Sequence, residues 1–416
     1  MSRESTVARI DSAETCSEPV LRTSTFLLCA VAFLADVAAG LVVIALPFAA
    51  TRLGAELGPV GLIGGLYMGA YALACLAAGP FIDRFRPRGV LIAGQFVQAA
   101  VSIGIALTGR LSVLIVLVGA YGMLMVTVWP PLMSWLAHGH DGAALNRRIG
   151  WFNVSWCSGL VVGPVLGGRL YELSPTAPFI AAAVVLAAGA LLTTAVRLPQ
   201  PPAIRPREAP CPAPPAPAPR PDAAVFRLMA RISVVVCTAI AGMQRFQVFG
   251  LAEALDVRKA TWGLVMAGMS LANMAGFLLL GRTHRWHYRP AVLWGAQIML
   301  AAATVSLVLA RGAWHLGTVA IITGLCGSVA YSSSLYYGVS GGRRRGALTA
   351  VHEMLLSAGF VIGAIGSGAM SQRFDLWTPY PIAAAVLGCA VLVQVIIYRA
   401  ARLRMPNPTM HFRETT

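Results

Sequence analysis

The sequence is short of charged residues and almost free of lysine. Only 12% of its 416 residues are Asp, Glu, Lys or Arg, and Lys259 is the single lysine among 32 basic residues. Hydrophobic residues make up 57% of the chain, and the mean hydropathy is +0.72. A water-soluble protein of this length has too little interior to bury so much apolar surface, so the composition indicates a membrane protein.

The sequence also lacks the patterns that mark most enzymes and cofactor-binding proteins. It contains no catalytic triad, no glycine loop for a nucleotide phosphate and no cluster with metal-ligand spacing. We therefore predict no enzyme activity, no catalytic residues, no cofactor and no metal. The eight cysteines show no paired or CxxC spacing, and most lie in apolar runs where a small buried thiol is expected: residues 16, 29, 75, 157, 211, 237, 326 and 389.

A basic net charge of +16 would suggest nucleic acid as a partner in a soluble protein. Here the arginines lie between hydrophobic runs and form no basic face interleaved with aromatics, so we expect no nucleic acid partner. The polar, mixed-charge segment 1–23 leads directly into a full-length apolar span, so we predict a tail and no signal peptide.

Twelve apolar runs are long enough to cross a bilayer, because a spanning helix needs about 20 apolar residues. This predicts an all-α protein with twelve transmembrane helices. The runs are 24–47, 60–81, 89–108, 111–134, 148–170, 177–196, 228–250, 261–281, 290–310, 313–337, 346–370 and 378–398.

The arginines predict how these helices are oriented. If the N-terminus is cytoplasmic, most of the 32 basic residues fall on the cytoplasmic side, which is the positive-inside pattern. We therefore predict that both termini are cytoplasmic, in a multi-pass protein of a bacterial inner membrane. The few basic residues left for the outer side are Arg52, Arg110, Arg169, Arg258, Lys259, Arg311 and Arg373.

A proline-rich segment divides the chain into two halves. Residues 197–226 hold eleven prolines, which keep a backbone extended and unpaired, so we predict a cytoplasmic linker. The predicted organisation is a tail, a six-helix bundle, this linker, a second six-helix bundle in the same orientation and a second tail. Their bounds are 1–23, 24–196, 197–226, 227–400 and 401–416.

A stripe of glycines marks the fifth run and returns in the eleventh. Gly159, Gly163 and Gly167 are four residues apart, so they share one face of a helix and let a neighbouring helix approach closely in lipid. Pro164 and Gly168 complete the motif, and Gly359, Gly363 and Gly368 repeat it about two hundred residues later. The repeat indicates two similar halves that meet along these helices.

Two motifs resemble those of the major facilitator superfamily. The loop after the second run matches the family's signature at Gly79, Asp83, Arg84 and Arg88, whereas Arg86 and Pro87 replace its Gly-Arg pair. The stretch 159–168 resembles the helix 5 motif of the family's antiporter branch. The fourth helix lacks the arginine usual in proton-driven drug exporters.

The resemblance implies two bundles that rock around a central site. It also implies that Asp83 latches the cytoplasmic ends together, that helices 1, 4, 7 and 10 line the central path, and that helices 2, 5, 8 and 11 join the halves.

Charged residues inside apolar spans are costly and therefore stand out as candidates for function. Asp36 lies in the first run and Arg245 in the seventh, so the resemblance places both on the central path. One interpretation is an ion pair that substrate or a proton breaks; the other is a structural pair or a helix cap. Glu353 and His352 form a candidate proton-coupling pair in the eleventh run, or a hydrogen-bonded link at the cytoplasmic gate.

Uncharged polar and aromatic residues complete the candidate substrate site. Gln244 neighbours Arg245, while Trp129, Tyr331 and Tyr336 lie in the fourth and tenth runs, where lining of the path and an interfacial belt are both plausible. Pro130 and Pro131 are expected to break the fourth helix.

These patterns, together with the resemblance to the major facilitator superfamily, imply a monomeric secondary transporter in the lipid bilayer. It would move a small organic solute by alternating access, coupled to protons as an antiporter, in the direction of efflux. The alternatives are uptake of an organic anion or sugar-like solute, and a transporter-like membrane sensor that does not transport.

Overall fold

The computed structural model describes residues 18–82, 85–138, 142–197, 222–339 and 345–404. Every regular element in those ranges is a helix, and twelve helical segments are long and apolar enough to cross a membrane. The prediction of an all-α membrane protein with twelve spans is therefore confirmed. The predicted linker and both tails lie almost entirely outside the described residues.

The first six spans pack into one bundle, in which α2 lies against α7 and α8 while α3 packs on α5. Pro87 opens α4 at its first turn, where the missing N–H has no intrahelical partner to lose. The helices are α2 (Glu18–Arg52), α3 (Leu57–Ile82), α4 (Pro87–Leu107), α5 (Leu111–Leu124), α6 (Trp129–Ala137), α7 (Gly142–Leu173) and α8 (Ala177–Thr194).

The second six spans repeat this arrangement, with α9 against α14 and α11 against α13. Pro290 opens α12 as Pro87 opens α4. The helices are α9 (Ala223–Phe246), α10 (Val248–Ala254), α11 (Lys259–Gly281), α12 (Pro290–Ser306), α13 (Ala313–Val339), α14 (Arg345–Arg373) and α15 (Pro379–Arg404).

Two spans are interrupted inside the apolar region. The fourth span breaks into α5 and α6 at a short 3-10 turn, Met125–Thr127, just before Pro130 and Pro131, which confirms the expected break. The seventh span breaks between α9 and α10 at Gln247, a position that the sequence did not single out. This second break lies two residues beyond Arg245, so an intramembrane arginine stands at the end of a helix.

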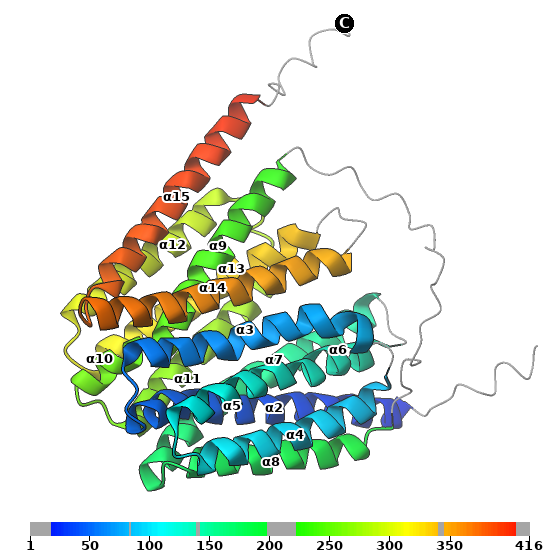
Figure 1. Cartoon of the computed structure of the whole chain (residues 1–416). Coiled ribbons are helices and arrows are strands. Elements are labelled where there is room, and N and C mark those ends of the chain that lie inside the picture. The colour runs from blue at the N-terminus through cyan, green and yellow to red at the C-terminus, as the bar shows by residue number, and fades with distance from the viewer. Residues whose placement is uncertain (1–17, 83–84, 139–141, 198–221, 340–344, 405–416) are drawn as a thin grey trace, which may run out of the picture.

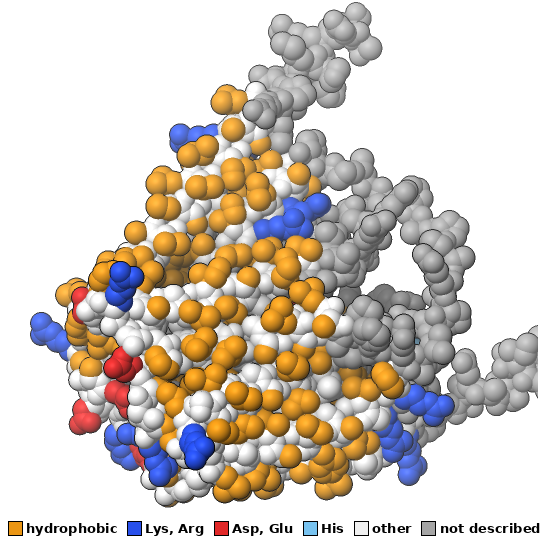
Figure 2. All heavy atoms as spheres, in the orientation of Figure 1, with side chains coloured by type: hydrophobic (Ala, Val, Ile, Leu, Met, Phe, Trp, Pro, Cys, Tyr) orange, Lys and Arg blue, Asp and Glu red, His pale blue; other side chains and the backbone are white. Residues whose placement is uncertain are grey.

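The bundles approach each other at one end of the molecule and splay apart toward the other. We call the end where α2 begins and α15 ends the terminal end, and the opposite end the distal end. Figure 1 shows α15 and α9 rising away from α2 and α4 toward the terminal end, whereas α3 and α14 run side by side. The face in Figure 2 is mostly hydrophobic across its middle, and its acidic side chains gather at the distal end.

Most glycines of the two stripes face a helix of their own bundle: Gly159, Gly163 and Gly167 face α2, and Gly359 and Gly363 face α9. A methyl group built on Gly163 would lie 2.6 Å from the carbonyl oxygen of Val37 and 2.8 Å from the Cα of Gly40, both on α2. In the second bundle, a methyl group on Gly363 would collide with the carbonyl oxygen of Ala239 on α9. The stripes therefore hold α2 on α7 and α9 on α14, because only glycine permits this backbone-to-backbone approach.

Candidate functional site

The two bundles meet along α3 and α7 of the first and α14 and α11 of the second, and we call this surface the inter-bundle seam. Glycines also allow the helices of the two bundles to lie close together. A methyl group on Gly368 of α14 would lie 2.5 Å from the carbonyl oxygen of Leu57 and 3.0 Å from the Cα of Gly61, both on α3. The pair Gly168 and Gly263 does the same for α7 and α11. The fifth and eleventh spans thus join the bundles through Gly168 and Gly368, the last glycines of the two motifs.

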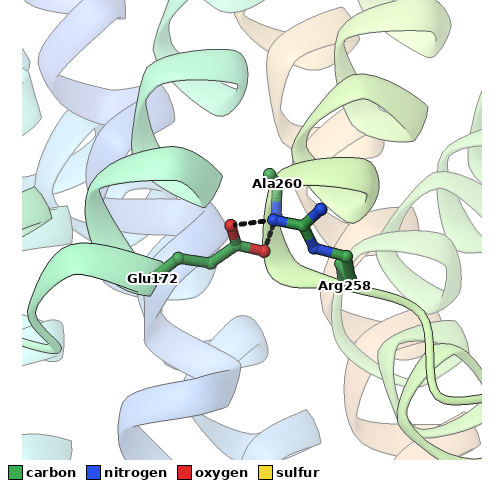
Figure 3. A network of polar contacts seen from close by, with 3 residues as sticks. All are labelled: Glu172, Arg258 and Ala260. Atoms are coloured by element: carbon green, nitrogen blue, oxygen red, sulfur yellow. Dashed lines mark hydrogen bonds and ion pairs between the residues drawn. The ribbon is translucent and has the colours of Figure 1, made fainter.

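At the distal end, polar side chains tie the bundles together. Glu172, at the end of α7, accepts hydrogen bonds of 3.0 Å from the guanidinium of Arg258 and from the backbone N–H of Ala260 (Figure 3). It therefore forms an ion pair and caps the N-terminus of α11 from the other bundle. On the α3–α14 side, the amide of Gln372 donates to the carboxylate of Glu56. Four side chains from the two bundles thus hold the distal end closed.

Asp36 lies inside the first span on α2, with only 5% of its surface exposed. It packs beside the glycine stripe, because a methyl group on Gly159 would lie 2.8 Å from its Cβ. Within the described part of the chain it has neither a hydrogen bond nor an ion pair. Its carboxylate interacts electrostatically with Arg245 of the other bundle and with Tyr67 on α3.

Arg245 is half-buried at the end of α9 and likewise has no ion pair or hydrogen bond among the described residues. Its guanidinium carbon lies 5.9 Å above the ring of Phe360 on α14, a cation–π arrangement. Phe246 follows Arg245 and packs edge-on against Phe360, with 6.0 Å between ring centroids. The aromatic contacts hold the charge at the seam without neutralising it.

Two tyrosines of the first bundle stand around this charged pair. Tyr67 on α3 and Tyr121 on α5 are stacked with 6.1 Å between ring centroids, and both are almost fully buried. Both interact electrostatically with Asp36, and the hydroxyl of Tyr121 has no hydrogen-bond partner among the described residues. Together these groups form a polar cluster in an otherwise apolar region of the seam.

Glu353 and His352 lie on α14, nearer the terminal end, and the structure separates their environments. The Nδ1 of His352 is 2.9 Å from the hydroxyl of Ser334, and its ring packs edge-on against Tyr331 at 4.7 Å. His352 is buried, whereas the side chain of Glu353 is exposed and interacts with Tyr71 and Tyr331. The sequence placed the two residues side by side, but their side chains have different neighbours.

The other predicted substrate residues do not gather around Asp36 and Arg245. The amide of Gln244 donates to the hydroxyl of Thr323 inside the second bundle, at 3.3 Å. Trp129 packs edge-on against Phe152, within the first bundle. Tyr336 stacks on His287 at 4.0 Å, in an aromatic cluster toward the terminal end.

The signature loop is only partly described. Gly79 lies in α3, and Arg88 donates to the backbone carbonyl of Thr194, which joins α4 to the end of α8. Asp83 and Arg84 lie outside the described residues. The predicted cytoplasmic latch therefore stays a prediction.

Several residues of this region were not singled out from the sequence. Tyr67, Tyr121 and Phe360 are ordinary constituents of an apolar span, so only their spatial relation to a charge distinguishes them. One weak indication of the contact made by Glu172 was present in the sequence. This acidic residue lies at the outer end of the fifth predicted span, and the basic residue Arg258 lies in the next predicted outer loop. Among the described residues, no group of three His, Cys, Asp or Glu side chains has the proximity that a metal ion requires.

Solved structures of low sequence identity share this fold. A bacterial homolog of the human lysosomal transporter Spinster, inward-facing and occupied, has a TM-score of 0.70 at 15% identity, covering 93% of this chain and 97% of its own. The nucleoside transporter NupG has a TM-score of 0.68 at 14% identity, covering 90% and 99%. A POT family transporter in complex with a thioalcohol-conjugated peptide has a TM-score of 0.74 at 10% identity, covering 91% and 96%.

No curated protein matches the chain in sequence. The profile of the Major Facilitator Superfamily, however, matches residues 28–340, which is most of the chain and includes the seam helices of both bundles except α14. This match agrees with the twelve spans in two bundles and with the close glycine contacts between helices. The chain belongs to the major facilitator superfamily.

Proposed function

We propose that this membrane transporter moves a small organic solute by alternating access, with Asp36 and Arg245 at the solute site. The observation that carries the proposal is the placement of these two opposite charges: they lie on different bundles, face the inter-bundle seam and bind neither each other nor any other described charge. Rocking of the bundles changes the distance between such groups, so solute binding there is coupled to the conformation.

The splayed arrangement supports a specific direction of opening. The distal end is held by Glu172 with Arg258 and by Gln372 with Glu56, whereas α9 and α15 diverge from the first bundle toward the terminal end. We propose that the terminal end is cytoplasmic, as the arginine distribution predicts, so that this conformation is inward-facing. One structural neighbour, the Spinster homolog, is itself inward-facing.

We further propose that transport is coupled to protons and runs in the direction of efflux. The candidate proton acceptors are Asp36, faced by Arg245, Tyr67, Tyr121 and Cys157, and Glu353, faced by Tyr71, Cys75 and Tyr331. His352 adds a third titratable group beside Tyr331 and Ser334. The direction rests on the resemblance of 159–168 to the antiporter motif, and the plasma membrane of a bacterium is the proposed location.

A second candidate function is uptake of an organic anion. It is favoured by Arg245, whose guanidinium lies over the ring of Phe360 and has no described carboxylate within ion-pair distance. A carboxylate-bearing solute would supply that partner through a bidentate contact.

The test uses the full chain in proteoliposomes with a pH-sensitive dye inside and an imposed pH gradient. A thermal-shift screen of small amphipathic compounds selects the solute, because a ligand of the folded state raises its apparent stability. Solute-dependent proton movement should be lost in Asp36→Asn or Glu353→Gln and kept in Asp375→Asn, a control carboxylate in a distal loop. Solute flux without proton movement contradicts the coupling, and tight binding without any flux identifies a sensor.

A further inference from the structure

Among the described residues, the two charges at the seam have no ion-pair partner, although each lies in an apolar region. Asp36 is 5% exposed, and Arg245 is half-buried against Phe360. An uncompensated charge in a membrane interior is costly, and natural proteins keep such groups mainly where function needs them. A direct ion pair would lower this cost, but Asp36 and Arg245 interact only over a longer distance.

The repeat shows that bundle packing requires neither charge. Gly359 meets Thr238 and Val235 on α9, just as Gly159 meets Asp36 and Phe33 on α2. Thr238 thus occupies in the second bundle the place that Asp36 occupies in the first. Arg245 lies three residues after Gly242, whereas the residue three positions after the matching Gly40 is Val43.

The groups around the pair suit a solute with two opposite charges. A guanidinium binds a carboxylate through two parallel N–H···O contacts, and a carboxylate binds an ammonium group strongly when water is excluded. Tyr67, Tyr121 and Phe360 supply apolar and aromatic surface next to both charges, which suits the carbon skeleton that joins them.

We propose that the seam binds zwitterionic solutes, with the ammonium group on Asp36, the carboxylate on Arg245 and the carbon skeleton against Tyr67, Tyr121 and Phe360. This inference rests on the proposed transport function and names the substrate class of the same site. Such a solute supplies both missing partners at once and bridges the two bundles, which neither a simple amine nor a simple acid does.

The test compares matched probes that differ only in charge, using the purified full-length protein. One trio is phenylalanine, phenethylamine and 3-phenylpropionate. A second trio with a larger charge separation is 6-aminohexanoate, hexylamine and hexanoate. In at least one trio, the two-charge member should bind about tenfold or more tightly than either single-charge member, since each lost contact is a charge-assisted hydrogen bond.

Two variants test which charged group of the probe binds Asp36 and which binds Arg245. In Asp36→Asn the two-charge probe should bind no better than the matching acid, and in Arg245→Gln no better than the matching amine. Asp375→Asn, at a distal loop, should keep the tenfold preference. If neither variant is stable enough to purify, Tyr121→Phe, which removes one unpartnered hydroxyl next to Asp36, should change the affinity for the two-charge and amine members while leaving the acid unchanged.

Flux measurements separate a failure of this inference from a failure of the proposed function. If no two-charge probe is preferred in either trio, or if the preference survives both charge variants, the zwitterion site is overturned. Flux of an amine or an acid without that preference leaves transport in place and removes only the substrate class. Preferential zwitterion binding without flux has the reverse meaning: the site is supported and the transport function is not.

Discussion

The two bundles share their backbone packing but differ in the polar groups placed on it. Gly159 and Gly163 hold α7 on α2 as Gly359 and Gly363 hold α14 on α9. The corresponding polar positions differ: Thr238 stands where the first bundle has Asp36, and Gln372 stands where it has Glu172. The comparison indicates that glycines specify the repeat, whereas the charges were placed independently in each bundle.

The interior polar residues show a second difference. Gln297 in the second bundle bonds to Ser233 at 3.0 Å and exchanges hydrogen bonds with Gln394, at 2.9 and 3.2 Å. Gln95, its counterpart on α4, is fully buried, lies against Gly189, and has no hydrogen-bond partner among the described residues. At these matched positions, Gln297 connects three helices of the second bundle, whereas Gln95 connects α4 to no other helix of the described residues.

The largest expected effect is at the glycine stripes. Gly163→Ala and Gly363→Ala each place a methyl group against backbone atoms of the neighbouring helix, which cannot move aside as a side chain can. We expect each to lower the free energy of unfolding by about 1–3 kcal/mol, measured as a lower thermal midpoint of the purified protein.

Matched controls exist on the same two helices. A methyl group on Gly150 or Gly366 would meet nothing within 4 Å. Alanine there should leave the thermal midpoint unchanged or raise it, because alanine favours a helix. Equal losses at all four positions would show that general helix effects, and not the close helix contacts, explain the glycines.

The next effect distinguishes the two matched glutamines, Gln95 and Gln297. Gln297→Leu leaves Ser233 and Gln394 without their amide partner, and we expect it to lower stability by about 1–2 kcal/mol. Gln95→Leu removes an unpartnered amide, so its thermal midpoint should stay constant or rise. A loss of stability in Gln95→Leu comparable with that in Gln297→Leu would mean that Gln95 has a partner that this conformation does not contain.

A smaller effect is expected at the polar contacts that join the bundles at the distal end, Glu172 with Arg258 and Glu56 with Gln372. Glu172→Gln removes the charge of a pair that is 25% exposed at Glu172 and 77% exposed at Arg258, so the loss should be below about 1 kcal/mol. Because salt screens exposed charges, the difference from the unmodified protein should disappear in about 1 M NaCl. Glu56→Gln keeps a neutral hydrogen bond with Gln372 and serves as the control, since its effect should not depend on salt.

The smallest effect concerns the turns that follow α7 and α14, one seam helix from each bundle. Asp375, before α15, accepts hydrogen bonds from the side chain and backbone of Thr378 and from the backbone of Trp377, and these bonds lower its pKa. Ser174 takes this role in the first bundle, where its hydroxyl bonds to Thr176. A lowered carboxyl pKa stabilises the fold above the ordinary pKa of aspartate, and the contribution is lost as the pH falls through the lowered value.

Thermal midpoints measured from pH 6 down to pH 3 should therefore fall less steeply in Asp375→Asn than in the unmodified protein. Asn retains part of the capping geometry and does not titrate. Ser174→Ala should shift the midpoint by the same amount at every pH. An identical acid dependence in Asp375→Asn would assign the titration to another carboxylate.

The sequence predicted the spans and their number because apolar length is a strong and local signal. It also predicted the break before Pro130, since proline lacks the N–H that a continuous helix needs. The break at Gln247 was not predicted from the sequence, because no proline marks it and the polar residues around Arg245 lie within one continuous predicted span.

The site was predicted only in part, for a geometric reason. Asp36 and Arg245 stand out because charge is rare in apolar spans, but Tyr67, Tyr121 and Phe360 do not differ from many other aromatics. The glycine stripe was expected to join the two halves, whereas Gly163 faces its own bundle and Gly168 faces the other one. Small residues on adjacent faces of one helix do not reveal from spacing alone which neighbour each face meets.

The glycine contacts also limit how such a chain can diverge. Where carbonyl oxygens press against α-carbons, as at Gly61 and Gly368, no larger residue is accepted without moving an entire helix. Exposed hydrophobic side chains such as Leu107 and Ile396 carry no such constraint. Variation can therefore accumulate over most of the surface while the points of backbone contact stay fixed, which is compatible with a shared architecture at 10–15% identity to the solved transporters.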